Sequence, residues 1–136
     1  MPFKNLLSSL PITKREVKIR KLKKNDKIIK IAKKFSRQYF DSTREFGYGG
    51  YRYDGRWKSV AKDIVSFFKL NKNDRILDIG CAKGFLVKDL LDEEMNVFGI
   101  DVSEYAIKNC HPDVVGRVSL ANAKKLPFPS NSFDAV

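Results

Sequence analysis

Hydrophobic and polar residues alternate along this chain in blocks whose periods differ from one block to the next. Between residues 56 and 68 apolar side chains recur every three or four positions, which predicts one amphipathic helix. Residues 75–79 instead form a short apolar run with β-branched character, as expected of a strand buried on both faces of a parallel sheet. Gly80 and Gly84 follow, and helical spacing returns over 85–91. The centre of the chain is therefore predicted to be a helix, a buried strand, a glycine turn and a second helix.

The alternation of strands and helices continues to the end of the sequence. Apolar runs predict strands over 96–100, over 114–120 and from residue 133 onward. Between the first two, Ser103 caps a helix predicted over 104–109. Strands that alternate with helices form a parallel sheet covered by helices on both faces. The predicted fold class is therefore α/β, with a Rossmann-like sheet.

A basic amphipathic helix is predicted before these elements. Asn25 or Asp26 is a suitable N-cap. The apolar positions that follow lie on one stripe, formed by Ile28, Ile31, Ala32, Phe35 and Tyr39. The few apolar residues between 13 and 24 suit a strand or a helix, and both interpretations stay open.

Residues 41–55 are rich in glycine and tyrosine, a composition that forms no regular element and contains too many rings for a disordered segment. Two interpretations are equally open. In the first, the loop closes over a bound nucleoside, with Tyr51 and its neighbouring tyrosines offering rings and Arg52 or Arg56 meeting a carboxylate. In the second, the loop packs onto the domain through its rings, and Arg56 only opens the next helix.

Length and composition fit one domain preceded by an arm, with 136 residues of which 43% are hydrophobic. We expect a basic arm over 1–40, a Gly/Tyr loop over 41–55 and a ligand-binding domain over 56–136. No apolar run approaches the ~20 residues that span a bilayer, and the N-terminal apolar patch lacks a signal-peptide cleavage site. Cys81 and Cys110 fit no metal-ligand spacing, so we expect reduced thiols, no metal and a cytoplasmic location.

The net charge of +11 is concentrated near the N-terminus. Residues 1–37 hold 13 Lys and Arg against two acids, whereas residues 38–136 hold 14 of each sign. This asymmetry suggests an anionic partner, so residues 14–37 are a candidate segment for binding RNA or an anionic membrane surface. A helix that packs on the domain and presents its lysines to water explains the same pattern. We favour that interpretation because few aromatic residues stand among the cations.

The spacing of the glycine turn separates three kinds of nucleotide site. A dinucleotide fingerprint requires glycine at positions 80, 82 and 85, and the chain has only the first. A phosphate-binding loop requires Gly-Lys-Ser/Thr, whereas Lys83 precedes Gly84 here. The series Asp78-x-Gly80-x-Ala82-x-Gly84 resembles motif I of the class I S-adenosylmethionine (SAM)-dependent methyltransferases, with alanine in place of the middle glycine.

Asp101, at the end of the second predicted strand, supports a nucleoside ligand. Its two oxygens can accept hydrogen bonds from both ribose hydroxyls, although NAD-binding folds use the same acid. Asp101 matches the family's motif II, and Asn122-Ala123 stands where the family usually has Asp-Ala. The resemblance covers about residues 56–136. It implies that Asp78 and the turn backbone hold the amino-acid end of SAM, that Asp101 holds the ribose, and that Asn122 and Ala123 hold the adenine.

The candidate cofactor-binding residues are Asp78, Gly80, Cys81, Ala82, Gly84, Asp101, Val102, Asn122 and Ala123, together with Tyr51 and Arg56. The resemblance implies in-line transfer of the sulfonium methyl group to an acceptor, and no catalytic base can be assigned. His111 is interpreted as a helix-exit residue.

The family's sheet has strand order 3-2-1-4-5-7-6, so the sequence reaches only the opening of strand 4. We expect a fragment of a longer chain that is inactive by itself. A small-molecule, sugar or lipid acceptor is slightly preferred. The alternatives are an RNA methyltransferase that uses the basic arm, a nucleotide-binding oxidoreductase, and a non-enzymatic domain that supports RNA or membrane binding.

Overall fold

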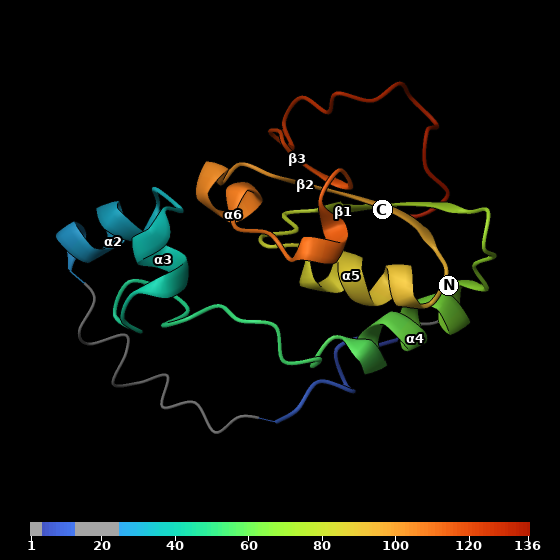
Figure 1. Cartoon of the computed structure of the whole chain (residues 1–136), viewed down its shortest axis with the longest axis horizontal. Helices are drawn as coiled ribbons and strands as arrows, with labels where there is room; N and C mark the ends of the chain where they lie inside the picture. The colour runs from blue at the N-terminus through green and yellow to red at the C-terminus, as the bar shows by residue number, and fades with distance from the viewer. Residues whose placement is uncertain (1–3, 13–24) are drawn as a thin grey trace.

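A small parallel sheet forms the centre of the computed structural model, which describes residues 4–12 and 25–136. Strands β1 (Arg75–Ile79), β2 (Asn96–Asp101) and β3 (Val118–Leu120) are hydrogen-bonded in the order β1-β2-β3 (Figure 1). On the free side of β1, Ala135 forms a parallel bridge with Ile76. The predicted α/β class is confirmed, and the predicted fourth strand is present as this single bridge.

Three helices flank the sheet: α4 (Lys58–Phe68), α5 (Phe85–Asp92) and α6 (Glu104–Lys108). Helix α5 packs between α4 and β2, and α6 contacts β2 and β3. On the opposite face of the sheet, the ring of Phe98 contacts that of Phe133, with centroids 6.2 Å apart. The segment after β3 therefore contributes to covering the face opposite α5, and it arches over the sheet in Figure 1.

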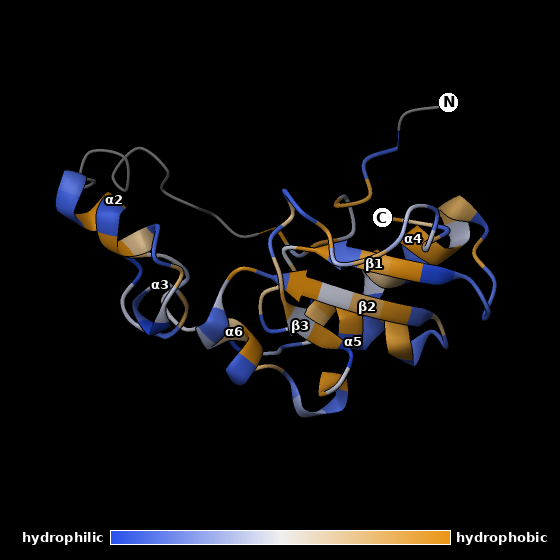
Figure 2. Ribbon diagram, turned by 90° about the horizontal axis from the view of Figure 1, so that it is seen from above, coloured by the Kyte–Doolittle hydropathy of each residue, from blue (hydrophilic) through white to orange (hydrophobic). Residues whose placement is uncertain are grey.

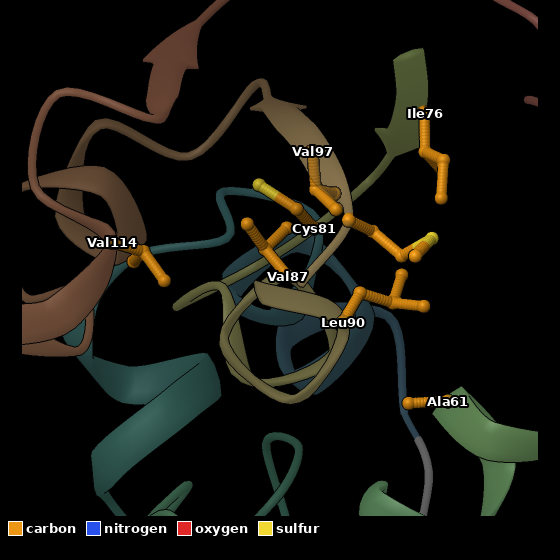
Figure 3. Close-up of a cluster of buried hydrophobic side chains, with 8 residues drawn as sticks. Ala61, Ile76, Cys81, Val87, Leu90, Val97 and Val114 are labelled. Atoms are coloured by element: carbon orange, nitrogen blue, oxygen red, sulfur yellow. The ribbon is translucent and has the colours of Figure 1, made fainter. Parts of the chain in front are cut away.

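The core lies between α5 and the strands, where the apolar stretches of β1 and β2 meet those of the helices (Figure 2). Figure 3 shows the cluster, which consists of Ala61, Ile76, Cys81, Val87, Leu90, Met95, Val97 and Val114. Cys81, a candidate site residue, is thus buried in the core, and its sulfur lies beneath Gly99 of β2. We infer that the Cys81 side chain packs the turn against β2.

The predicted third strand is too long. Only Val118–Leu120 pairs as a strand, because Pro112–Val114 forms a 3-10 helix, η1, and Gly116 turns the chain with φ +81°. His111 precedes η1, and its Nδ1 accepts a hydrogen bond from the Asp113 N–H at 3.2 Å. The apolar run from 114 therefore mixes a buried helical turn with a short strand.

The single helix predicted after Asn25 is two helices. Asn25 caps α2 (Asp26–Ala32) through a hydrogen bond from the Ile28 N–H, as expected, and α3 (Arg37–Asp41) follows after a break. Phe35 lies in the break with φ +46°, and its carbonyl accepts a hydrogen bond from the Ser103 hydroxyl. The break in the apolar stripe thus coincides with a contact between distant residues. The undecided stretch 13–24 lies outside the described residues.

Candidate cofactor-binding site

The glycine turn after β1 is anchored to the end of β2. The N–H groups of Gly80 and Cys81 both donate to the Ile100 carbonyl, at 2.8 and 3.0 Å. Gly80 has φ +85°, and a Cβ there would meet only open space. Gly84 has φ +75°, and a Cβ there would lie 2.8 Å from a methyl of Val114. Both glycines are therefore required by backbone conformation, and Gly84 also by close packing.

Ala82 occupies the position of the family's middle glycine and has φ +52°, a conformation that costs an alanine about 1 kcal/mol. Its methyl group belongs to a second buried cluster with Phe40 of α3 and Ala106 of α6. This packing offsets the strain. Alanine is therefore compatible with the turn because the segment before the domain covers it.

Asp101 ends β2 beside the turn and is held by two backbone groups. Its Oδ2 accepts from the Ala82 N–H at 2.8 Å, and its Oδ1 accepts from the Ser103 N–H at 2.7 Å. Each oxygen keeps a second lone pair, so the half-buried carboxylate can still accept from two hydroxyl groups. The backbone contacts orient it toward the turn.

The carboxylate of Asp78, near the end of β1, has no hydrogen bond or ion pair with any described residue. Burial and the nearby charge of Asp101 raise the pKa of Asp78 from 3.8 to about 6. Two carboxylates therefore share this edge of the sheet without a cation between them. A bound ammonium group would relieve that repulsion.

Residues after β2 and β3 complete the edge. Val102 is 52% exposed, and Asn122 and Ala123 are exposed in the turn after β3. The Asn122 Oδ1 accepts from the Lys124 N–H at 2.9 Å, so this oxygen is partly used by its own turn. The Asn122 side-chain N–H₂ group and one lone pair stay available to a ligand.

The Gly/Tyr loop packs onto the domain through its rings. The ring of Tyr51 stacks on that of Phe85, with centroids 4.7 Å and planes 19° apart, and Tyr53 contacts both Phe85 and His111. Burial, then the neighbouring Tyr48 and the charge of Asp78, raise the pKa of Tyr51. The rings of the loop are thus packed on the domain, and Tyr51 lies close to Asp78.

Arg56 is already engaged, because its guanidinium group binds the Asp54 carboxylate through three contacts of 2.6 to 3.0 Å. Asp54 has a lowered pKa, chiefly because of this hydrogen bonding. Arg56 lines a cavity of about 570 Å³ together with Tyr51, Trp57 and Phe85. A ligand carboxylate would have to compete with Asp54 for Arg56.

Two buried polar residues escaped the sequence analysis. Lys83, within the turn, is 8% exposed and binds Asp41 at the end of α3. Asp89 of α5 is 1% exposed and accepts a hydrogen bond from the Tyr53 hydroxyl. A lysine inside an otherwise small and apolar turn was the available signal for the first. Nothing in the helical spacing of α5 distinguishes Asp89 from an exposed carboxylate.

Across residues 4–12 and 25–136, no cluster of His, Cys, Asp and Glu has a geometry that could hold a metal ion. No helix in the same ranges has the length and hydropathy needed to cross a bilayer.

Residues 77–136 match the family model described as "Methyltransferase domain". The matched residues start within β1 and include the glycine turn, Asp101 and Asn122. The match is partial, over 60 of the 136 residues, and it is to a class I SAM-dependent methyltransferase domain, a family whose cofactor is S-adenosylmethionine.

Individual proteins match over part of their length. A demethylmenaquinone methyltransferase of Symbiobacterium thermophilum is 32% identical over 95 residues, which cover 60% of this chain and 37% of that protein. The mitochondrial arginine-hydroxylase NDUFAF5 of Rattus norvegicus is 40% identical over 62 residues, or 44% of this chain and 18% of that protein. The chain thus spans less than two fifths of either relative.

Among solved structures, the PH0226 protein of Pyrococcus horikoshii OT3 superposes with a TM-score of 0.51 and 23% identity. The superposition covers 72% of this chain and 45% of that one. This likeness shows the fold.

Proposed function

We propose that this chain is the cofactor-binding part of a methyltransferase that uses SAM to methylate a small-molecule acceptor. Asp78 and the carbonyl groups of the turn would bind the amino-acid end of SAM. Asp101 would bind the ribose, and Asn122 with Ala123 the adenine. When bound, SAM supplies a methyl group that its positive sulfur has already made electrophilic.

The pair of carboxylates at the turn carries this proposal. Asp78 is half-buried, its carboxylate has no ion pair with a described residue, and its pKa is raised to about 6. The N–H groups of Gly80, Cys81, Ala82 and Gly84 all donate within the protein. The glycine turn therefore offers mainly acceptors, which suit an ammonium group and hydroxyls better than a pyrophosphate. The charge at this edge thus favours SAM over a dinucleotide.

The chain's own contribution to the reaction is binding and orientation. Asp101 is held by two backbone N–H groups, so it can present both oxygens to a ribose without rearrangement. The exposed apolar side chains of Ile79 and Val102 flank the same edge and can exclude water from a bound nucleoside.

A small-molecule acceptor is supported by the demethylmenaquinone methyltransferases among the relatives, whose name gives a quinone-type acceptor. RNA is the second candidate acceptor. It is favoured by the exposed lysines of α2 alone.

Isothermal titration calorimetry of the intact chain with SAM and with NADH tests the proposal. We expect SAM to bind and NADH to give no heat, and Asp101→Asn to weaken SAM about tenfold because one charge-assisted hydrogen bond is lost. Asp113→Asn, on an exposed residue of η1, is the control and should bind SAM like the wild type. Binding of NADH but not SAM would favour the oxidoreductase alternative, and binding of neither would reject a cofactor role.

A further inference from the structure

Lys83 connects the glycine turn to the segment that precedes the domain. Its Nζ donates to the Asp41 Oδ2 at 2.6 Å and to the Tyr51 carbonyl at 3.1 Å, and it lies 5.8 Å from the ring centre of Tyr105. The residue is only 8% exposed. A lysine is rarely so buried unless a partner compensates its charge, and here the partner is Asp41.

Asp41 gathers three elements around one carboxylate. Besides Lys83, it accepts from the Tyr51 N–H at 3.1 Å and from the Tyr105 hydroxyl of α6 at 2.8 Å. Burial alone would raise the pKa of Asp41, but the hydrogen bonds from Lys83, Tyr105 and Tyr51 outweigh it and lower that pKa. The carboxylate thus stays ionised and paired.

These contacts hold Tyr51 by its backbone on both sides. Its N–H is bound by Asp41 and its carbonyl by Lys83, and its ring then lies on Phe85, the first residue of α5. The charge of Asp78 is close enough to raise the pKa of Tyr51. The position of this ring relative to Asp78 therefore depends on the Asp41–Lys83 pair.

We propose that Lys83 is a positioning residue, which docks the Gly/Tyr loop on the cofactor turn and sets the Tyr51 ring beside the amino-acid end of the bound cofactor. This role rests on the function proposed above. Because Lys83 belongs to the turn itself, the contacts that dock the loop also connect it directly to the turn. Asp41 provides the matching charge from outside the domain.

A positioning role predicts that loss of Lys83 weakens only ligands that carry the amino-acid end, whereas a general stabilising role predicts equal losses for all ligands. In the intact chain, Lys83→Met should weaken binding of SAM and of S-adenosylhomocysteine at least tenfold in calorimetry. The same variant should bind 5′-methylthioadenosine, which lacks the amino-acid end, within twofold of the wild type. Lys108→Met is the matched control, because Lys108 pairs with Glu104 on the exposed surface of α6, and it should change none of the three affinities.

A measurement without any cofactor keeps the two proposals separate. Trp57 is the only tryptophan of the chain, and its side chain lies beside the Tyr51 hydroxyl. We expect Lys83→Met to shift the Trp57 emission and Lys108→Met to leave it unchanged. The double variant Asp41→Asn/Lys83→Met removes both charges, avoids an unpaired buried carboxylate and should show the same shift in a folded chain.

Three results would overturn the role of Lys83: unchanged Trp57 emission in both variants, equal losses for SAM and 5′-methylthioadenosine, or SAM affinity within twofold of the wild type. If wild-type SAM binding is absent while the emission shift occurs, the docking contact stands and the proposed cofactor fails.

Discussion

Two carboxylates on neighbouring strands, Asp78 and Asp101, differ in how the protein satisfies them. Asp101 accepts from two backbone N–H groups, whereas the Asp78 carboxylate has no hydrogen bond or ion pair within the described ranges. A partly buried carboxylate without a partner costs free energy of folding, and such a cost is often found where a ligand completes the site. At this edge of the sheet, Asp78 is therefore the carboxylate that lacks a compensating partner.

The free energy of unfolding of the chain without ligand should depend on pH because of Asp78. Burial and then Asp101 raise the pKa of Asp78 from 3.8 to about 6, so its contribution to stability is complete below pH 4 and is lost as pH rises through 6. Asp78→Asn cannot ionise, so its free energy of unfolding should exceed that of the wild type by about 3 kcal/mol at pH 7.5. The two should match near pH 4. Urea unfolding across this range is the measurement, and a difference that does not change with pH would contradict the assignment.

At the scale of single elements, a glycine in the turn can be needed for its positive φ or for the space around it, and the sequence motif does not say which. Gly80 and Gly84 both have positive φ, but only Gly84 is also closed in by a neighbouring side chain. Gly80 faces open space, as a position that a ligand approaches would. A side chain at position 84 would therefore collide with Val114, whereas a side chain at position 80 would fill space that a ligand could occupy.

Alanine substitutions separate strain from packing. Gly116→Ala places a Cβ at φ +81° with nothing within 4 Å and should cost about 1 kcal/mol. Gly84→Ala adds a clash at 2.8 Å with Val114, and we expect a loss of about 3 kcal/mol. Both values come from chemical denaturation. Equal losses would mean that Val114 moves aside at no cost.

The elements differ in how far local pattern determines them. β1, α5 and β2 were predicted nearly to the residue because their apolar periods are long and are ended by glycine or a polar turn. The break between α2 and α3 was not predicted; at this break the Phe35 carbonyl accepts a hydrogen bond from Ser103, 68 residues away. Contacts between distant residues produce no periodic pattern of apolar residues in the local sequence, so the sequence does not predict them.

At the scale of the whole molecule, charge and site lie in different parts of the chain. α2 exposes Lys27 and Lys30, followed by Lys33, Lys34 and Arg37, and none of these pairs with a carboxylate of the described residues. The cofactor turn instead lies beside the two carboxylates of Asp78 and Asp101. An anionic polymer would therefore bind away from the proposed cofactor site.

Removing residues 1–36 tests the RNA alternative: if α2 binds RNA, the truncation should abolish binding of a single-stranded RNA oligomer while SAM affinity changes less than twofold. For the wild type, engagement of about four phosphates implies a roughly 50-fold loss of RNA affinity between 50 and 200 mM salt. Fluorescence anisotropy gives the RNA affinity, and calorimetry gives the SAM affinity. RNA binding that survives the truncation would place the contact on the domain.

The sequence by itself determined the order of strands and helices, the glycine turn and the acid that follows the second strand, because each depends on residues close together in the chain. Only the tertiary structure decided that Asp78 is left without a partner, that Arg56 is bound to Asp54, and that Lys83 reaches Asp41. Those outcomes depend on burial and on which distant side chains meet, since the energy of a charge is determined by its surroundings.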